Sequence, residues 1–130
     1  MRLSEQELYA MNTALRRFVQ RMVEFPTFRQ LGLGPNPGHL LEIGCGSGFG
    51  ASLLQTLKPA SYVSIDLMSE QITLAQKRQL PQAEFRVQDA SDLSCFPNGS
   101  KDTMVIFGMV HHIPDWQKAI RGFGIFAVCK

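Results

Sequence analysis

Residues 40–50 read LLEIGCGSGFG, an apolar run that passes into a glycine-rich turn and then into a helical pattern. Glycines in such a turn let a ligand approach the backbone closely, and the following helix adds free N–H groups and a positive dipole end. The dinucleotide pattern GxGxxG fits poorly from Gly44, where Phe49 replaces the third glycine, but it fits from Gly46 with Ala51 as its last member. The turn alone therefore predicts a nucleotide-like ligand and leaves two cofactor classes open.

Strands and helices alternate after this turn. Apolar runs predict strands at residues 40–43, 62–65, 85–87 and 103–107, and helical spacing predicts helices near residues 49–57 and 69–79. The strand at 103–107 is apolar on both faces, as a central parallel strand is. Alternation with short connections is typical of a parallel sheet wound with helices, so we expect an α/β fold.

A helix is predicted before the sheet. Ser4 followed by Glu7 is a capping-box signature, and the helix should end near Glu24, before Pro26. Apolar residues recur along this helix at helical spacing: Leu8, Met11, Leu15, Phe18, Met22 and Val23. We expect this apolar face to pack in the core, and Tyr9 and Phe18 to be core residues as well. Three arginines lie mainly off this stripe, on an expected solvated face: Arg16, Arg17 and Arg21.

Residues 31–39, LGLGPNPGH, are rich in helix breakers and mark a boundary. We expect a helical N-terminal segment at residues 1–35 and the main fold at residues 36–130.

Composition limits the class of protein. The chain has 130 residues, of which 45% are hydrophobic and 18% charged, as in one soluble globular domain. Its net charge of +2 is far from the basic excess of nucleic-acid-binding proteins, and no leader or membrane span is apparent. The three cysteines lie far apart without a CxxC pair, which disfavours a disulfide framework and a zinc site. We expect a cytoplasmic protein with no metal and no nucleic-acid or membrane partner.

Three acidic residues lie at the predicted strands. Glu42 interrupts an apolar strand, where a carboxylate is costly to bury unless a cationic ligand or a backbone network partners it. Asp66 ends the second strand, where a carboxylate can accept both hydroxyls of a ribose, which suits NAD and S-adenosylmethionine alike. Asp89 follows the third strand. Since the carboxyl ends of parallel strands share one edge, these residues predict a binding site beside the glycine turn.

These motifs resemble those of the class I S-adenosylmethionine-dependent methyltransferases, particularly the branch that includes the quinone-biosynthesis enzymes. Residues 42–48, EIGCGSG, are similar to the family's E/D-x-G-x-G-x-G loop, which wraps the methionine portion of the cofactor. Residues 66–75, DLMSEQITLA, resemble the segment whose acidic residue holds the ribose. Residues 89–102 and 109–116 are similar to the next two motifs, the second of which borders the methyl-transfer site.

The resemblance implies a Rossmann-like, doubly wound and mostly parallel sheet with the strand order 3-2-1-4, and a small-molecule methyl acceptor. It implies that S-adenosylmethionine contacts the following residues: Glu42, Gly44, Cys45, Gly46, Gly48, Asp66, Leu67, Met68, Asp89, Ala90 and Phe107. In this reading Asp89 contacts the adenine amino group, and Cys45 is a small loop residue with no catalytic role. His111 and His112 follow the fourth strand, where a ring can take a proton from the acceptor.

The resemblance ends near Ile120. The remaining tail either keeps helical spacing or forms a fifth strand at residues 125–129, and glycines at 122 and 124 favour a helix that ends near Arg121. Without the family's later strands, the fourth strand should be an exposed apolar edge that favours a homodimer or another partner. Two other functions stay open at this point: a cofactor-binding module without catalysis, and an NAD-binding oxidoreductase core, against which Glu42 and Asp89 argue.

Overall fold

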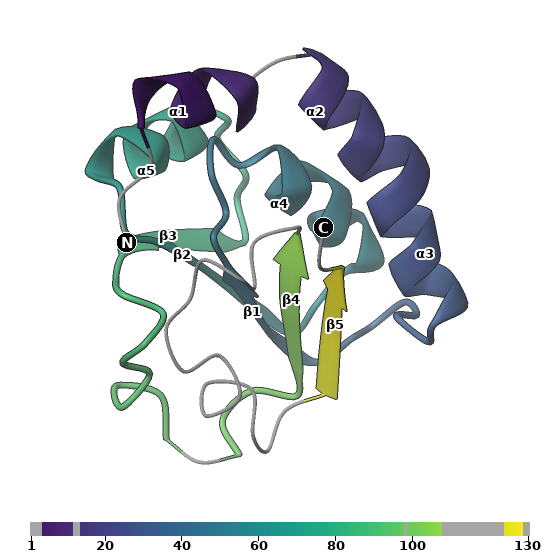
Figure 1. The fold of residues 1–130 in the computed structure, drawn as a ribbon. Coiled ribbons are helices and arrows are strands. Elements are labelled where there is room, and N and C mark those ends of the chain that lie inside the picture. Colours follow the sequence, from purple (N-terminus) through teal and green to yellow (C-terminus); the bar gives the residue numbers. More distant parts are fainter. Residues whose placement is uncertain (1–3, 12–13, 98, 108–123, 129–130) are drawn as a thin grey trace.

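The structure is a computed structural model, which describes residues 4–11, 14–97, 99–107 and 124–128. It contains one five-stranded sheet in the order β3-β2-β1-β4-β5, and every neighbouring pair runs parallel (Figure 1). The strands are β1 (His39–Ile43), β2 (Ser61–Asp66), β3 (Ala83–Val87), β4 (Thr103–Phe107) and β5 (Gly124–Val128). The expected α/β fold and the order 3-2-1-4 are confirmed.

The sheet is apolar on both faces because its central strands are covered on both sides. One core cluster contains Leu40, Tyr62 and Val105 together with side chains of the helices. The other contains Leu41 and Ile43, from the opposite face of β1, with further residues of β2 and β4. Alternation along a strand sends neighbouring side chains to opposite faces, so a strand buried on both faces appears as a continuous apolar run.

The fifth strand corrects one expectation. Residues 124–128 pair with β4 in the register Thr103↔Gly124 to Phe107↔Val128, so β4 is an inner strand. The expected exposed edge at β4 is therefore wrong, because the backbone groups of β4 find partners in β5. The expected homodimer through that edge loses its physical basis. The expected helix end near Arg121 lies outside the described residues.

Helices cover the sheet. After β1 come α4 (Phe49–Leu54) and the short 3-10 helix η2 (Gln55–Leu57), and α5 (Ser69–Gln76) follows β2. The N-terminal segment comprises α1 (Glu5–Met11), α2 (Ala14–Val19), the π-helical turn η1 (Gln20–Glu24) and α3 (Phe25–Gln30). The turn η1 packs against α4, so the N-terminal helices join the helical layer on that face of the sheet. None of the helices in the described residues has the length and apolar character that a membrane span needs.

The N-terminal helix begins as predicted and ends later. Ser4 N–H donates to Glu7 Oε2 at 2.9 Å and Glu7 N–H to Ser4 Oγ at 3.2 Å, which is a capping box. The predicted end near Glu24 is wrong, since helical structure continues through Pro26 to residue 30. Pro26 stands in the first turn of α3, directly after a π turn, where its missing N–H and its ring are tolerated.

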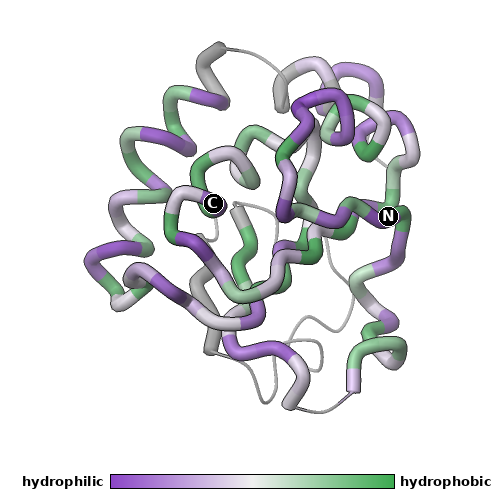
Figure 2. Tube along the Cα trace, turned by 180° about the vertical axis from the view of Figure 1, so that it is seen from behind, coloured by the Kyte–Doolittle hydropathy of each residue, from purple (hydrophilic) through white to green (hydrophobic). Residues whose placement is uncertain are grey.

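The predicted apolar stripe of this segment is only partly a core face. Phe18 is 59% exposed and Tyr9 is 77% exposed, so their expected burial is wrong. Met22 and Val23 are exposed as well, and Phe28, beyond the predicted helix, is fully buried. Figure 2 shows hydrophobic and hydrophilic segments alternating along α2 and α3. Helical spacing thus identified an apolar face without identifying what it contacts.

Candidate functional site

The glycine turn lies at the carboxyl ends of β1 and β2. Gly44 N–H and Cys45 N–H both donate to the carbonyl oxygen of Ile65, at 2.9 and 3.1 Å, which ties the turn to β2. Gly46 and Gly48 have φ of 54° and 88°, a region that side chains rarely adopt. Both positions therefore favour glycine over a residue with a side chain.

Asp66 joins the loop to the end of β2. Its Oδ2 accepts the N–H of Gly46 at 3.0 Å, and its Oδ1 accepts the N–H of Met68 at 2.9 Å. Burial raises the pKa of Asp66 above its usual value, although these two N–H groups favour the ionised form. Each carboxylate oxygen keeps a second lone pair, which can accept a hydroxyl group of a ligand.

Glu42 is 1% exposed and has two hydroxyl partners. Tyr62 and Ser64 of β2 both donate to its Oε1, each at 2.8 Å. Burial raises the pKa of Glu42 to about 7, although the two hydroxyl groups oppose the shift. The sequence predicts a cationic ligand or a backbone network as the partner of Glu42, whereas its partners in the structure are two side-chain hydroxyls of the neighbouring strand. Sequence reasoning missed both hydroxyls, which the pairing register Glu42↔Ser64 identifies.

Asp89 lies close to the same edge. Gln88 N–H donates to the carbonyl oxygen of Asp66 at 2.9 Å, which fixes the start of the loop after β3. Asp89 Oδ1 accepts the N–H and the hydroxyl of Ser91, at 2.9 and 2.8 Å, and these bonds lower the pKa of the exposed Asp89 carboxyl. The backbone bond of Gln88 thus joins the start of the loop that carries Asp89 to the end of β2.

The remaining residues that the sequence predicts as cofactor contacts differ in how far they are exposed to solvent. Met68 is buried and Leu67 half-buried at the start of α5, and Ala90 belongs to a core cluster. Cys45 is buried, and burial raises the pKa of its thiol well above the usual value, so a thiolate nucleophile is disfavoured there. Phe107 ends β4, and its side chain lies outside what the structure describes. His111 and His112 lie outside the described residues.

Comparisons with known proteins agree with this geometry. The family model described as a methyltransferase domain matches residues 41–123. The chain is 43% identical over 81 residues to the phthiotriol/phenolphthiotriol dimycocerosates methyltransferase of Mycobacterium leprae, covering 61% of this chain and 30% of that protein. It is 29% identical over 120 residues to the ubiquinone biosynthesis O-methyltransferase of Xanthomonas euvesicatoria, covering 90% of this chain and 46% of that protein.

A solved structure shows the same fold. The S-adenosylmethionine-dependent methyltransferase from Aquifex aeolicus superposes with a TM-score of 0.74 at 15% identity, covering 93% of this chain and 65% of that one. The chain spans less than half the length of the two curated relatives that it matches.

Proposed function

Because the chain belongs to the class I S-adenosylmethionine-dependent methyltransferase family, we propose that it binds S-adenosylmethionine beside the glycine turn and methylates a small-molecule acceptor. The hydrogen bond from Gly46 N–H to Asp66 Oδ2 carries this proposal, because it joins the open loop and the ribose-type carboxylate into one unit. Similarity to a phthiotriol/phenolphthiotriol dimycocerosates methyltransferase and to a ubiquinone biosynthesis O-methyltransferase supports a small-molecule acceptor. On the sequence evidence of reduced thiols, we place the chain in the cytoplasm.

The residues present fit this cofactor. Asp66 offers acceptor lone pairs to ribose hydroxyls. The positive φ of the loop glycines disfavours side chains there, and at Gly48 the missing side chain lets the turn pack closely against Ala75 of α5. The proposed contacts are those predicted from the sequence: Glu42, Gly44, Cys45, Gly46, Gly48, Asp66, Leu67, Met68, Asp89, Ala90 and Phe107.

Catalysis in this proposal is mainly positioning. Bound S-adenosylmethionine supplies a methyl group on a sulfonium, which is already activated for transfer. The chain's task is to hold that cofactor rigidly beside the acceptor, which converts an encounter in solution into a reaction within one complex. His111 or His112 is the proposed base that takes the acceptor's proton.

Calorimetric titration of the chain with S-adenosylhomocysteine tests the site. We expect a dissociation constant of about 1–100 µM and no binding of NADH, with Asp66→Asn weakening binding roughly tenfold or more. Glu84→Gln is the matched control, since it removes a similar charge from an exposed pair on β3 and should leave the affinity unchanged. Selective binding of NADH, or full affinity in Asp66→Asn, would contradict the proposed site.

Activity needs a separate measurement. Transfer of labelled methyl groups to a panel of phenolic and carboxylic acceptors should be lost in Asp66→Asn. Tight binding without transfer to any acceptor would instead favour a cofactor-binding module.

A further inference from the structure

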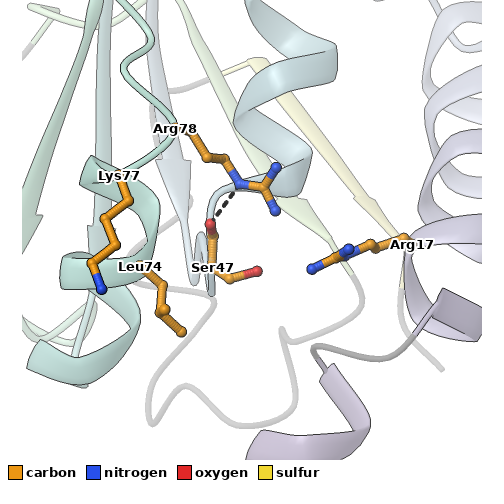
Figure 3. A pocket seen from close by; sticks show the side chains of 5 residues that line it. All are labelled: Arg17, Ser47, Leu74, Lys77 and Arg78. Carbon is orange, nitrogen blue, oxygen red and sulfur yellow. Dashed lines mark hydrogen bonds between the residues drawn. The ribbon is translucent and has the colours of Figure 1, made fainter.

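A pocket lies between the glycine turn and the helices α2 and α5, and its described lining contains none of the residues named above as cofactor contacts. Its volume is about 400 Å³, and its described lining is Arg17, Ser47, Leu74, Lys77 and Arg78. Figure 3 shows the side chains of Arg17 and Ser47 pointing toward one another, with Leu74 and Lys77 on the opposite side. Small-molecule sites commonly measure about 300–1,000 Å³, so the pocket is large enough for an organic ligand.

The lining is strongly cationic. Arg17 comes from α2, whereas Lys77 and Arg78 come from the C-terminal end of α5, so the fold itself gathers these charges. No carboxylate belongs to the described lining. Burial and the charge of Arg17 lower the pKa of Arg78, as expected where cations meet without an acidic neighbour. An anion would offset this repulsion.

One of the cations is held in place. Arg78 Nε donates to the carbonyl oxygen of Ser47 at 2.8 Å, and its guanidinium carbon lies 5.7 Å from the centre of the Phe49 ring. These contacts use one of five N–H donors and leave the terminal nitrogens for a ligand. A fixed guanidinium fork suits the oxygens of a phosphate group better than a freely rotating side chain does.

We propose that this pocket binds a phosphomonoester, with the phosphate between Arg17 and Arg78, an apolar group against Leu74, and Lys77 at the far rim. The lining offers donors in excess of acceptors, which matches a dianion with several acceptor oxygens. The volume exceeds that of a bare phosphate, and the 42% exposed Leu74 supplies an apolar wall. Asp66 precedes α5, whereas Lys77 and Arg78 follow it, so the pocket extends from Ser47 of the glycine turn toward the end of that helix that lies away from Asp66.

Titration calorimetry with phenyl phosphate and with inorganic phosphate, at constant ionic strength, tests the proposal. We expect saturable binding of both, with phenyl phosphate roughly fivefold tighter because its ring is buried against Leu74. Saturating S-adenosylhomocysteine should change either affinity by less than about twofold. Displacement by S-adenosylhomocysteine would assign the pocket to the cofactor, and no saturation up to about 20 mM would remove the site. Either result would overturn the proposal without affecting the direct test of cofactor binding.

Charge-matched variants locate the bound anion. Arg17→Gln should weaken phenyl phosphate binding roughly tenfold, since it removes a charge-assisted donor, and Lys77→Gln at the far rim should have a smaller effect. Arg29→Gln removes the same charge from an exposed position on α3 and should have no effect. An equal loss in Arg29→Gln would indicate general screening of charge and would overturn the assignment.

A separate variant tests the contribution of Leu74. Leu74→Ser should remove the preference for phenyl phosphate and leave the affinity for inorganic phosphate unchanged. A preference that persists in this variant would overturn the choice of a phosphomonoester.

Discussion

Glu42 places a titratable carboxyl group in the middle of the sheet, enclosed on all sides. Its pKa of about 7 lies above the usual 4.5, so between these pH values the folded chain keeps a proton that the unfolded chain has lost. Stability should therefore fall as the pH rises from about 4.5 to about 7. In the parent chain the free energy of unfolding should fall by up to about 3 kcal/mol over this pH range. We expect no such fall in Glu42→Gln, because its amide does not titrate.

Urea unfolding of the parent chain and of Glu42→Gln at pH 5 and pH 8 measures how the free energy of unfolding of each depends on pH. Glu84→Gln is the control, because the exposed Glu84 has a lowered pKa and should not reproduce the effect. The prediction fails if the parent chain and Glu42→Gln lose the same free energy of unfolding between the two pH values.

Substitution of Gly48 by alanine should lose stability for two reasons, an unfavourable backbone conformation and crowding by a neighbouring side chain. A Cβ atom at Gly48 would lie 2.9 Å from the Cβ of Ala75, and φ is 88°. Gly99 has a φ of 76° with no heavy atom within 4 Å of such a Cβ, and Gly34 has neither constraint. We expect alanine to cost about 1 kcal/mol at Gly99, about 3 kcal/mol at Gly48 and little at Gly34.

Chemical denaturation of the three alanine variants separates the contribution of the backbone conformation from that of crowding. Equal losses of stability at positions 48 and 99 would show that α5 moves away from the loop at no cost.

At the scale of elements, the N-terminal helices contain two phenylalanines with opposite environments. Phe28 is fully buried in the cluster beneath α4, whereas Phe18 is 59% exposed. We expect Phe28→Ala to cost about 3–5 kcal/mol and Phe18→Ala less than about 1 kcal/mol. Thermal unfolding of the two variants measures this difference, and a large loss of stability in Phe18→Ala would instead support the sequence-based expectation that Phe18 is a core residue.

The elements also show what sequence patterns could and could not predict. Glycine turns, apolar runs and their alternation predicted β1 to β4 and their order, because each depends on local spacing or on a family motif. The continuation past Pro26 was missed, because it depends on the π turn at residues 20–24, which has no spacing signature. Tyr62 and Ser64 were missed as partners of Glu42, because their approach depends on the register between strands.

Across the whole molecule, the breaker-rich residues 31–39 predicted a boundary, yet packing crosses it. Phe28 and Leu33 belong to the same core cluster as Leu40 of β1, so the helical segment and the sheet share buried surface. A shared core makes separate unfolding of residues 1–35 and 36–130 unfavourable.

We therefore expect one cooperative unfolding transition, with the same midpoint by far-ultraviolet circular dichroism and by urea-gradient mobility. A ligand that binds only the folded chain must shift this transition as a unit: S-adenosylhomocysteine at about 100 times its dissociation constant should add about 2.7 kcal/mol. Two transitions, of which the ligand moves only one, would instead show that the N-terminal helices are an independent unit. The shift is informative even before an acceptor is identified, because it links the loop at Gly46 and Asp66 to the stability of the entire fold.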